Sequence, residues 1–562
     1  MTQTSPDAPN ASPSAAHVRG NLLTPAYLWV TRQQGRRALG VAAGLGLIGN
    51  LAFPPLGVWP AMAVALSGLV WLLDGAKLTA NPGKAAFWRV FAFGFAYFLV
   101  SLYWIADAFL VEPDIYLIFI WMPLVALPGG LAFLLGWIMR FAYQFWCAGP
   151  ARLIIFSVAF MASEWFRGSL FGIGGLPWNL PGMVWAPGGA VSQTASIWGI
   201  YGLSLLTVVA LASPACLADA RPRGTTASRA APVLVAAVLF GAIWGWGAHR
   251  LATIPQEAPG LASGPMVRLV EIGTPQNQKF KSETANLMVS RFRDLSGPDS
   301  ADAPPIIVWP EGALPYWVFE WPDALDAITD RLGNRKLLIG VARREKAGTP
   351  DEKAFNSLAV LDSHSATSAP LAIYDKHMLV PFGEFTPFSN VLGMLGLKTL
   401  QKLAPGGFEP GPRPAIVRVP GVPPFGPLIC YEAIFPGLSP TGVDRPRWLV
   451  NISNDAWFGH LSGPYQHAAQ ARYRSIEEGL PMARVAAGGF TGMIDAYGRW
   501  TARGKPADPK VYGPDPKGWT SSVVDAAIPP MAQATPYSRW RDGLYWLMLL
   551  GLNLGLLVLP RR

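Results

Sequence analysis

The chain has 562 residues, of which 14% are charged and 51% are hydrophobic, and its mean hydropathy is +0.28. A soluble protein carries about a quarter charged residues, so this composition excludes a wholly soluble protein and indicates that much of the chain lies in lipid. The net charge of +10 is spread over loops between apolar segments, which favours membrane topology and no nucleic-acid partner. The cysteines are far apart, so we expect no metal, no other cofactor and no disulfide framework; they are Cys147, Cys216 and Cys430.

Residues 1–36 are rich in Ser, Pro, Ala and Thr and predict a disordered tail. Residues 37–250 then carry seven apolar segments, and an eighth occupies residues 543–560. Each segment predicts a transmembrane helix, although several are shorter than the roughly 20 residues that a span needs. The apolar cores of the eight lie near Leu39–Phe53, Val58–Leu73, Val90–Phe109, Ile115–Met139, Leu153–Phe166, Ile197–Leu217, Val233–Trp246 and Leu544–Leu559.

The basic residues alternate with these segments. If the amino terminus lies inside, the short outside loops hold the acids Glu112 and Asp114 and a single base, Arg167. The inside loops hold the remaining bases, including Arg36, Lys84, Arg140, Arg223 and Arg561. This is the positive-inside pattern, and it predicts cytoplasmic termini with residues after the seventh helix on the far side of the membrane.

Residues 265–530 have a different composition, in which short apolar runs alternate with polar helical stretches, and they predict an α/β domain between the seventh and eighth membrane helices. Strands are expected at Val267–Ile272, Ile306–Trp309, Leu337–Ala342, Ser357–Leu361, Ala415–Val419, Pro427–Ile429 and Trp448–Ile452. Helices are expected near Glu283–Leu295, Asp323–Leu332 and Tyr465–Glu478.

Reactive side chains follow three apolar runs that predict strand ends: Glu311 follows Ile306–Trp309, Lys376 follows the further strand Ala372–Tyr374, and Cys430 follows Pro427–Ile429. A cysteine at the carboxyl end of a strand sits on a sharp turn beside free backbone N–H groups. The carboxyl ends of strands in α/β folds converge, where a carboxylate can take the thiol proton and an ammonium can hold an oxyanion. Taken singly, Cys430 is more often a buried core residue, Glu311 a solvated turn carboxylate and Lys376 a surface charge. Their shared placement favours one catalytic site.

The letters WPE, then DK with a following PFGE, then CYE resemble the Glu-Lys-Cys pattern of the nitrilase, or carbon–nitrogen hydrolase, superfamily. With the membrane helices, five longer stretches resemble the apolipoprotein N-acyltransferase family: LAFPPLG, LPW, KHMLVPFGEFTPF, LICYEAIFP and NISNDAWFG. The resemblance covers nearly the whole chain after about Leu39. It implies a polytopic α-helical membrane domain of about eight helices in a bacterial inner membrane. It also implies an α/β nitrilase-like αββα sandwich on the periplasmic, extracytoplasmic side.

The resemblance also implies roles for single residues. Cys430 is the nucleophile, Glu311 the general base, and Lys376 stabilises the oxyanion together with the backbone N–H of Tyr431. Glu384 orients Lys376 or the thiol, and Tyr431 and Glu432 match positions that the family needs for activity.

Other matches concern the substrate. Asn356 and Trp457 match residues near the family's substrate pocket. Phe280 stands where the family usually has tryptophan, and Ala487 where it often has asparagine.

Two features leave alternatives open. The apolar stretches at residues 314–321, which include Trp317 and Phe319, and at residues 391–400 are either membrane-dipping arms that admit acyl chains or parts of the core. Glu164 and Arg167 are either functional charges at membrane depth or an i,i+3 ion pair.

The implied function is acyl transfer in two steps, the last step of lipoprotein maturation. Cys430 takes an acyl chain from a membrane phospholipid as a thioester, and the N-terminal α-amine of the diacylglyceryl-cysteine of an apolipoprotein then receives it. The expected partners are the phospholipid donor, the apolipoprotein acceptor and the membrane, and we expect a monomer. The alternative is a membrane-tethered amidase or nitrilase-type hydrolase. A transporter or receptor is less consistent with reactive residues clustered in one extramembrane domain.

Overall fold

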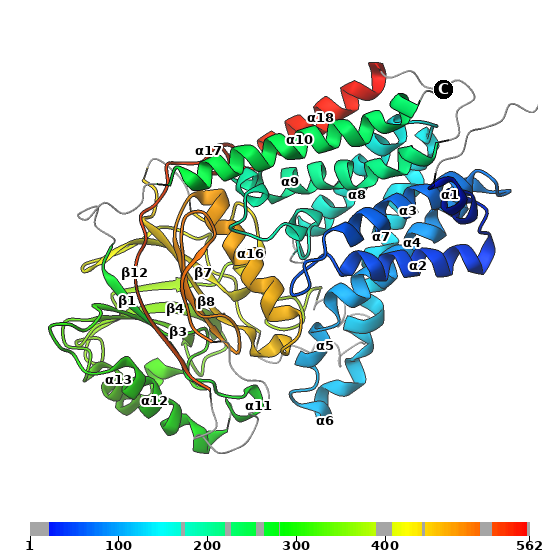
Figure 1. Ribbon diagram of the computed structural model, residues 1–562. Coiled ribbons are helices and arrows are strands. Elements are labelled where there is room, and N and C mark those ends of the chain that lie inside the picture. Colours follow the sequence, from blue (N-terminus) through cyan, green and yellow to red (C-terminus); the bar gives the residue numbers. More distant parts are fainter. Residues whose placement is uncertain are drawn as a thin grey trace, which may run out of the picture.

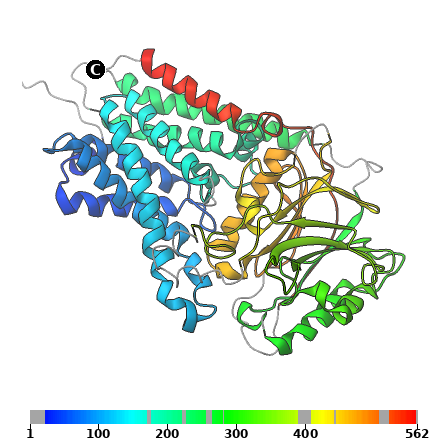
Figure 2. The ribbon, with the colours of Figure 1, turned by 180° about the vertical axis from the view of Figure 1, so that it is seen from behind.

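The computed structural model describes residues 22–169, 175–219, 226–254, 264–279, 281–388, 407–440, 444–505 and 520–558. A bundle of apolar helices lies beside a domain of two β-sheets (Figure 1). The last helix, α18 (Gly543–Val558), returns to the bundle and packs against α8 (Ala151–Gly168) and α9 (Ala195–Ala212), as the view from behind also shows (Figure 2). The sheet domain is therefore inserted between two helices of the same bundle.

The other helices of the bundle follow in chain order: α1 (Thr24–Thr31), α2 (Gly35–Asn50), α3 (Pro60–Ala76), α4 (Pro82–Leu102), α5 (Ile105–Ala108), α6 (Pro113–Tyr116), α7 (Leu127–Ala142) and α10 (Thr226–Ala252). In the described part of the chain, four helical runs are long and apolar enough to cross a membrane, namely Pro82–Leu102, Pro113–Phe145, Val191–Ala218 and Arg229–Ala252. The apolar helices Pro60–Ala76 and Gly543–Leu556 are shorter. Helix length and composition thus establish fewer spans than the eight that the sequence predicts.

The predicted helices have shifted bounds in the structure, and two of them show why. The Asn81 side chain accepts a hydrogen bond from the backbone N–H of Lys84 at 3.0 Å and Pro82 follows it, so α4 begins eight residues before the predicted Val90. The hydropathy pattern did not predict this first part of α4 because it contains the polar residues Lys84 and Arg89. The predicted segment Ile115–Met139 lies within the longer run Pro113–Phe145, which contains a π-helical turn at Met122–Ala126.

The predicted disordered tail is only partly described, since residues 1–21 lie outside the described residues. The prediction is wrong for residues 22–36, which contain α1 and the start of α2. The ring of Tyr27 packs edge-on against Trp71 of α3 at 5.9 Å, and Arg89 donates a hydrogen bond to the carbonyl oxygen of Gln33 at 3.0 Å. Amino-acid composition alone cannot predict that contacts with other helices order these residues.

The inserted domain consists of two six-stranded sheets. The first has the order β12-β1-β2-β3-β4-β5, with β1 (Met266–Glu271), β2 (Ile306–Val308), β3 (Lys336–Glu345), β4 (Lys353–Leu361), β5 (Ala372–Asp375) and β12 (Ser522–Ala527). The second has the order β11-β10-β9-β8-β7-β6, with β6 (Val417–Val419), β7 (Val422–Ile429), β8 (Trp448–Asn454), β9 (Met482–Ala487), β10 (Gly492–Ile494) and β11 (Trp500–Arg503).

Alternate residues of the strands face different cores, as the two-residue period of a strand requires. Ile306 and Val308 of β2 join the core between the two sheets, while Ile307 joins the core beneath α12 (Ser282–Ser296) and α13 (Pro322–Thr329). The outer face of the second sheet, with α16 (Gly463–Glu478), belongs to the same hydrophobic core as the membrane helices. The domain therefore has four layers: α12 with α13, the first sheet, the second sheet, and α16. The helix α16 lies between the second sheet and the helical bundle (Figure 1).

Every predicted strand is present, with bounds shifted by a few residues, and so are the three predicted helices of this domain. The sequence analysis missed β9 to β12. The strand β9 contains a fully buried arginine, Arg484, whose charge obscures the apolar pattern. The strand β12 is a sheet edge with alternating exposed residues.

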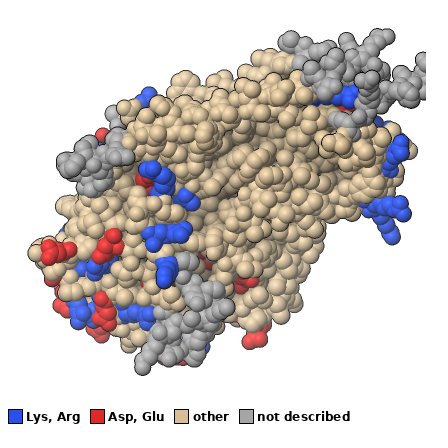
Figure 3. All heavy atoms as spheres, viewed as in Figure 1, with Lys and Arg blue, Asp and Glu red and all other residues tan. Residues whose placement is uncertain are grey.

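Charged side chains gather over the sheet domain and at the opposite end of the helical bundle, and the surface between them is almost free of charge in this view (Figure 3). Ion-paired side chains inside the bundle are buried, including Arg167 with Glu164 at 2.5 Å and Arg152 with Asp219 at 2.6 Å. The expected i,i+3 pairing of Glu164 with Arg167 is confirmed. A wide uncharged belt is typical of helices that face lipid.

Candidate active site

Cys430 lies where β7 ends and a short 3₁₀ helix, Cys430–Ile434, begins. Its φ angle is +47°, a left-handed conformation that costs a non-glycine residue on the order of 1 kcal/mol and is held only by its surroundings. The side chain is buried, with 5% exposed. The sharp turn expected after this strand is therefore present, and it aims a buried thiol at the neighbouring strand ends.

Glu311 and Lys376 meet at this turn. The ammonium Nζ of Lys376 lies 3.1 Å from Glu311 Oε1 and 3.0 Å from Glu384 Oε1. Asn356 of β4 donates its Nδ2–H to the same two carboxylate oxygens, each at 2.7 Å. The other oxygen of Glu311 accepts the backbone N–H of Asn454 at 2.9 Å. The structure thus joins two carboxylates, one ammonium and one amide in a buried cluster.

A glycine of β3 makes room for Glu311. A Cβ atom at Gly340 would lie 2.5 Å from both the Cα of Glu311 and the carbonyl oxygen of Pro310. The backbone of the Glu311 loop can therefore approach β3 only because position 340 has no side chain. The carbonyl of Gly340 accepts the backbone N–H of Ala313 at 2.9 Å, which fixes the loop just after Glu311.

The cluster sets the charge of each group. Burial opposes ionisation of Glu311, but Lys376 and hydrogen bonds from Asn356, Lys376 and the Cys430 thiol outweigh it and lower the pKa of Glu311. Burial opposes the charge of Lys376 as well, yet the two carboxylates raise its pKa. Burial and the charge of Glu311 raise the pKa of Cys430. At neutral pH the site therefore holds a carboxylate, an ammonium and a neutral thiol.

Glu432 connects the loops of the cluster. Its Oε2 accepts the backbone N–H of Ile429, the residue before Cys430, at 2.7 Å. Its Oε1 accepts the Tyr374 hydroxyl at 2.7 Å and the backbone N–H of His377 at 2.8 Å, on either side of Lys376. Glu432 is completely buried. One carboxylate thus sets the distance between the strand that ends at Cys430 and the strand that ends at Lys376.

A second buried network supports Cys430 from the side of α16. His467 lies with Nε2 3.1 Å from the carbonyl oxygen of Cys430 and Nδ1 2.8 Å from Asp455 Oδ1. Arg484 of β9 donates a hydrogen bond to Asp455 Oδ2 at 2.7 Å. Burial opposes the charge of Asp455, but Arg484 and His467 lower its pKa. The sequence analysis missed these residues, although Asp455 lies inside the motif NISNDAWFG.

The membrane helices contact the site through the segment after α8. Arg167 donates hydrogen bonds to the carbonyl oxygens of Leu176 and, at 2.7 Å, Trp178. The Trp178 Nε1–H donates to Gln466 Oε1 at 2.7 Å, next to His467, and the Tyr431 hydroxyl donates to the carbonyl oxygen of Gly175 at 2.6 Å. The residue before His467 and the residue after Cys430 are therefore both hydrogen-bonded to the segment that follows α8.

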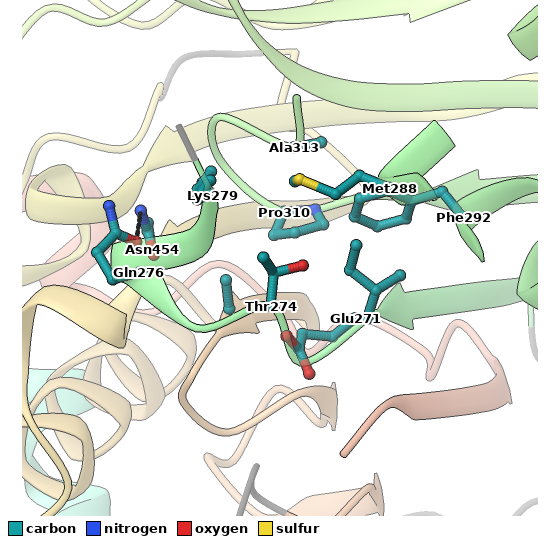
Figure 4. Close-up of a pocket in the computed structure, with 11 residues that line it drawn as sticks. Glu271, Thr274, Gln276, Lys279, Met288, Phe292, Pro310, Ala313 and Asn454 are labelled. Atoms are coloured by element: carbon teal, nitrogen blue, oxygen red, sulfur yellow. Dashed lines mark hydrogen bonds between the residues drawn. The ribbon is translucent and has the colours of Figure 1, made fainter. Parts of the chain in front are cut away.

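A small cavity of about 10 Å³ lies beside Pro310, the residue before Glu311, and has both polar and apolar lining residues (Figure 4). Lys279, Gln276 and Asn454 line it on one side, and Gln276 accepts a hydrogen bond from Asn454 at 3.2 Å. Burial lowers the pKa of Lys279 to about 8, against the attraction of Glu311 and Glu271. Ala487 also lines the cavity. Ala487 of β9 also pairs with Asn454 of β8, whose backbone N–H donates to Glu311. The departure from the family pattern at position 487 thus lies next to a hydrogen-bond partner of Glu311.

The residues predicted to contact substrate do not form one cluster, unlike Glu311, Lys376 and Cys430. Asn356 belongs to the Glu311 cluster, and Trp457 is half-buried in the 3₁₀ helix Asp455–Phe458. The ring of Trp317 packs against the guanidinium of Arg344 at 4.8 Å. Phe280 and residues 391–400 lie outside the described residues.

The stretch after Glu311 contributes mainly to the core. Leu314 and Val318 are buried beneath α12 and α13, and Phe319 packs against the same core, while Trp321 is 57% exposed. Of the two alternatives for residues 314–321, the structure favours core packing over a membrane-dipping arm.

The comparisons with known proteins cover both parts of the chain. Residues 45–215 match the family described as apolipoprotein N-acyltransferase N-terminal domain, and residues 303–510 match the carbon–nitrogen hydrolase family. The chain is 37% identical over 532 residues to the apolipoprotein N-acyltransferase of Caulobacter vibrioides, covering 92% of this chain and 94% of that protein. It is 34% identical over 513 residues to that of Rhodopseudomonas palustris, covering 89% and 91%. Among solved structures, an amidase from Nesterenkonia sp. is 15% identical with a TM-score of 0.33, covering 52% of this chain and 100% of that chain.

The facing sheets and the buried Glu311–Lys376 pair at the Cys430 turn define, with the match of residues 303–510, an enzyme domain of the carbon–nitrogen hydrolase class. This domain is joined to a bundle of apolar helices. The chain belongs to the apolipoprotein N-acyltransferase family, which confirms the resemblance seen in the sequence motifs.

Proposed function

We propose that this protein transfers an acyl chain from a membrane phospholipid, through a thioester on Cys430, to the N-terminal α-amine of the diacylglyceryl-cysteine of apolipoproteins. The observation that carries the proposal is the convergence of a buried carboxylate, ammonium and thiol on a turn that is bonded to the membrane helices. The relatives named apolipoprotein N-acyltransferase, at 34% and 37% identity, support it.

In the first half-reaction, the Cys430 sulfur attacks the ester carbonyl carbon while Glu311 accepts the thiol proton. Lys376 and the backbone N–H of Tyr431 stabilise the oxyanion that forms. The C–O bond of the ester then breaks, and the leaving lysophospholipid oxygen takes the proton from Glu311. The products are a thioester on Cys430 and a lysophospholipid.

In the second half-reaction, the neutral α-amine of the acceptor attacks the thioester carbon and gives a proton to Glu311. The C–S bond breaks, and the Cys430 sulfur recovers the proton from Glu311. The products are an amide and the free thiol. Because Glu311 accepts and returns one proton in each half, its lowered pKa keeps it ready as a base throughout.

The supporting residues act through the triad. Glu384 shares Lys376 with Glu311, so it holds the ammonium between two carboxylates. Asn356 donates to both carboxylates and holds them together beside the ammonium. We also propose Trp457 and Trp317 as substrate contacts, as the resemblance implies.

The same proposal places the protein in a bacterial inner membrane with eight spans, cytoplasmic termini and the catalytic domain on the periplasmic side. The uncharged belt and the distribution of basic loop residues support this arrangement (Figure 3). We further propose that it acts as a monomer. A membrane-tethered amidase would use the same triad, but matches over nearly the whole chain to N-acyltransferases favour an amine acceptor over water.

Intact-mass measurement tests the function directly. Purified protein is incubated with phospholipid and no acceptor, beside the Cys430→Ala variant. The expected result is a mass gain of one acyl chain that hydroxylamine removes and that the variant lacks, followed by discharge onto the amine of a diacylated peptide. Active protein that forms no adduct and releases ammonia from small amides would instead establish the amidase.

A further inference from the structure

A groove with a volume of about 510 Å³ lies between the helical bundle and the sheet domain. One wall comes from the bundle and includes Pro54, Trp59, Trp185 and Trp244. The other wall comes from α16 and the second sheet and includes Arg472 and Arg503. We call it the α16 groove. Its volume is in the range of small-molecule binding sites.

The α16 groove is separate from the candidate active site. Tyr465 and Arg472 of α16 line it and are seven residues apart, so they share one face of the helix. His467 points from the opposite face and contacts Cys430. Glu311, Lys376 and Cys430 are not among the residues that line the groove. The helix α16 therefore stands between the groove and the nucleophile.

The two arginines of the basic wall form no ion pair with a described carboxylate. Arg472 donates its Nε–H to the carbonyl oxygen of Gly498 at 2.7 Å and its Nη2–H to that of Pro187, both neutral groups. The guanidinium of Arg503 packs on the rings of Phe490 and Trp500, at 5.6 and 6.0 Å. Within the described residues, no carboxylate lies within ion-pair distance of either arginine. Burial lowers the pKa of Arg472 to about 10, the charge of Arg503 acts in the same direction, and Tyr473 and the more distant Asp495 oppose them. Two such cations at one groove favour an anionic ligand.

The opposite wall is apolar and belongs to helices of the bundle. Trp59 is at the start of α3, and its ring lies 5.4 Å from that of Trp185. Trp244 is on α10, a helix long and apolar enough to span a membrane, and is 60% exposed. Tryptophan is typical of the interface between lipid and water. A ligand that satisfies both walls has acyl chains on one side and a negative group on the other.

We propose that the α16 groove is a second, non-catalytic lipid site that binds an anionic phospholipid, with its phosphate on Arg472 and Arg503 and its acyl chains against Trp59, Trp185 and Trp244. Because the two walls come from different domains, the bound lipid joins the helical bundle to α16 and thereby to the support of Cys430. The site does not depend on the proposed acyl transfer.

Binding to the Cys430→Ala protein tests the site without turnover. Native mass spectrometry in detergent measures the dissociation constants of phosphatidylglycerol and of zwitterionic phosphatidylcholine. The variants are Arg503→Gln, in which an exposed charge is lost, and Trp244→Ser, in which an exposed ring is lost. The matched control is Arg331→Gln. Arg331 belongs to the same inserted domain but does not line the groove, and its ion pair with Asp294 is solvent-exposed.

We expect phosphatidylglycerol to bind about tenfold more weakly to each groove variant and unchanged to the control, with equal melting temperatures throughout. Inorganic phosphate at millimolar concentration should fail to displace the lipid. The proposal is overturned if Arg503→Gln and Arg331→Gln bind the lipid equally. It is also overturned if inorganic phosphate competes fully, which would indicate a site for a free anion, or if phosphatidylcholine binds as tightly as phosphatidylglycerol.

Discussion

His467 Nε2 lies 3.1 Å from the carbonyl oxygen of Cys430, although the two residues are 37 positions apart in the chain. The histidine is completely buried, and Asp455 holds its other ring nitrogen at 2.8 Å. Since the carbonyl belongs to the residue with φ +47°, this contact stabilises the left-handed turn that presents the thiol. His467 is therefore a positioning residue, which acts through the backbone of Cys430.

Replacing His467 tests this role. We expect His467→Ala to lower kcat on the order of 10- to 100-fold while KM changes little, because the turn relaxes and the thiol is misplaced by a fraction of an ångström. His467→Gln should recover part of the loss, since an amide N–H can donate to the same carbonyl. The measurement is steady-state kinetics with a diacylated peptide acceptor, with melting temperature as the control for folding. A rise in KM alone would contradict a positioning role.

The charges of the triad predict an unusual response of Cys430 to pH. Because burial and the charge of Glu311 raise its pKa, the thiol should stay neutral at pH values where an ordinary cysteine ionises, near 8.5. Alkylation of Cys430 by iodoacetamide should therefore still increase with pH above 9. In Glu311→Gln the main negative neighbour is gone while Lys376 remains, so the alkylation curve should move to lower pH as acyl transfer is lost. A curve that reaches its plateau near pH 8 in the unaltered protein would refute the neutral thiol.

Glu432 should matter for stability as much as for activity. It accepts hydrogen bonds from Tyr374, His377, Met378 and Ile429, so Glu432→Ala leaves several buried donors unpaired. We expect the free energy of unfolding to fall by about 3–5 kcal/mol, at the upper end for single substitutions. Thermal or denaturant unfolding in detergent measures it. Asp323→Ala, at the start of α13, is a control for which a change below about 1 kcal/mol is expected.

Glu271 predicts a dependence of stability on pH. Burial raises its pKa to about 7, even though it accepts the backbone N–H of Gly273 at 2.7 Å. The native state then binds a proton that the unfolded state releases at about pH 4.5, so this group stabilises the fold fully below that pH. The contribution falls as the pH rises from about 4.5 to about 7, by roughly 3 kcal/mol at most.

In Glu271→Gln this part of the pH dependence should vanish. The check is the free energy of unfolding of both proteins measured at intervals between pH 4.5 and pH 8. Parallel curves for the two proteins would show that Glu271 is ionised in the native state throughout.

Local patterns were enough to identify most elements and to predict the triad. The short apolar run from Ile306 to Trp309 predicts β2, and each predicted triad residue follows an apolar run closely enough to place it at a strand end. The same local information failed at β9, where the buried charge of Arg484 breaks the apolar pattern, and at residues 22–36, where α1 depends on contacts with α3.

The sequence by itself determined the family and the inserted α/β domain, and it predicted Glu311, Lys376 and Cys430 as the reactive residues, because these depend on short contiguous motifs. Only the tertiary structure decided that Asn356 bonds Glu311, that His467 supports Cys430, and that Arg472 and Arg503 share a groove with membrane helices. Hydrogen-bond partners and burial depend on segments that are distant in the chain, and a local pattern carries no information about which segments will pack together.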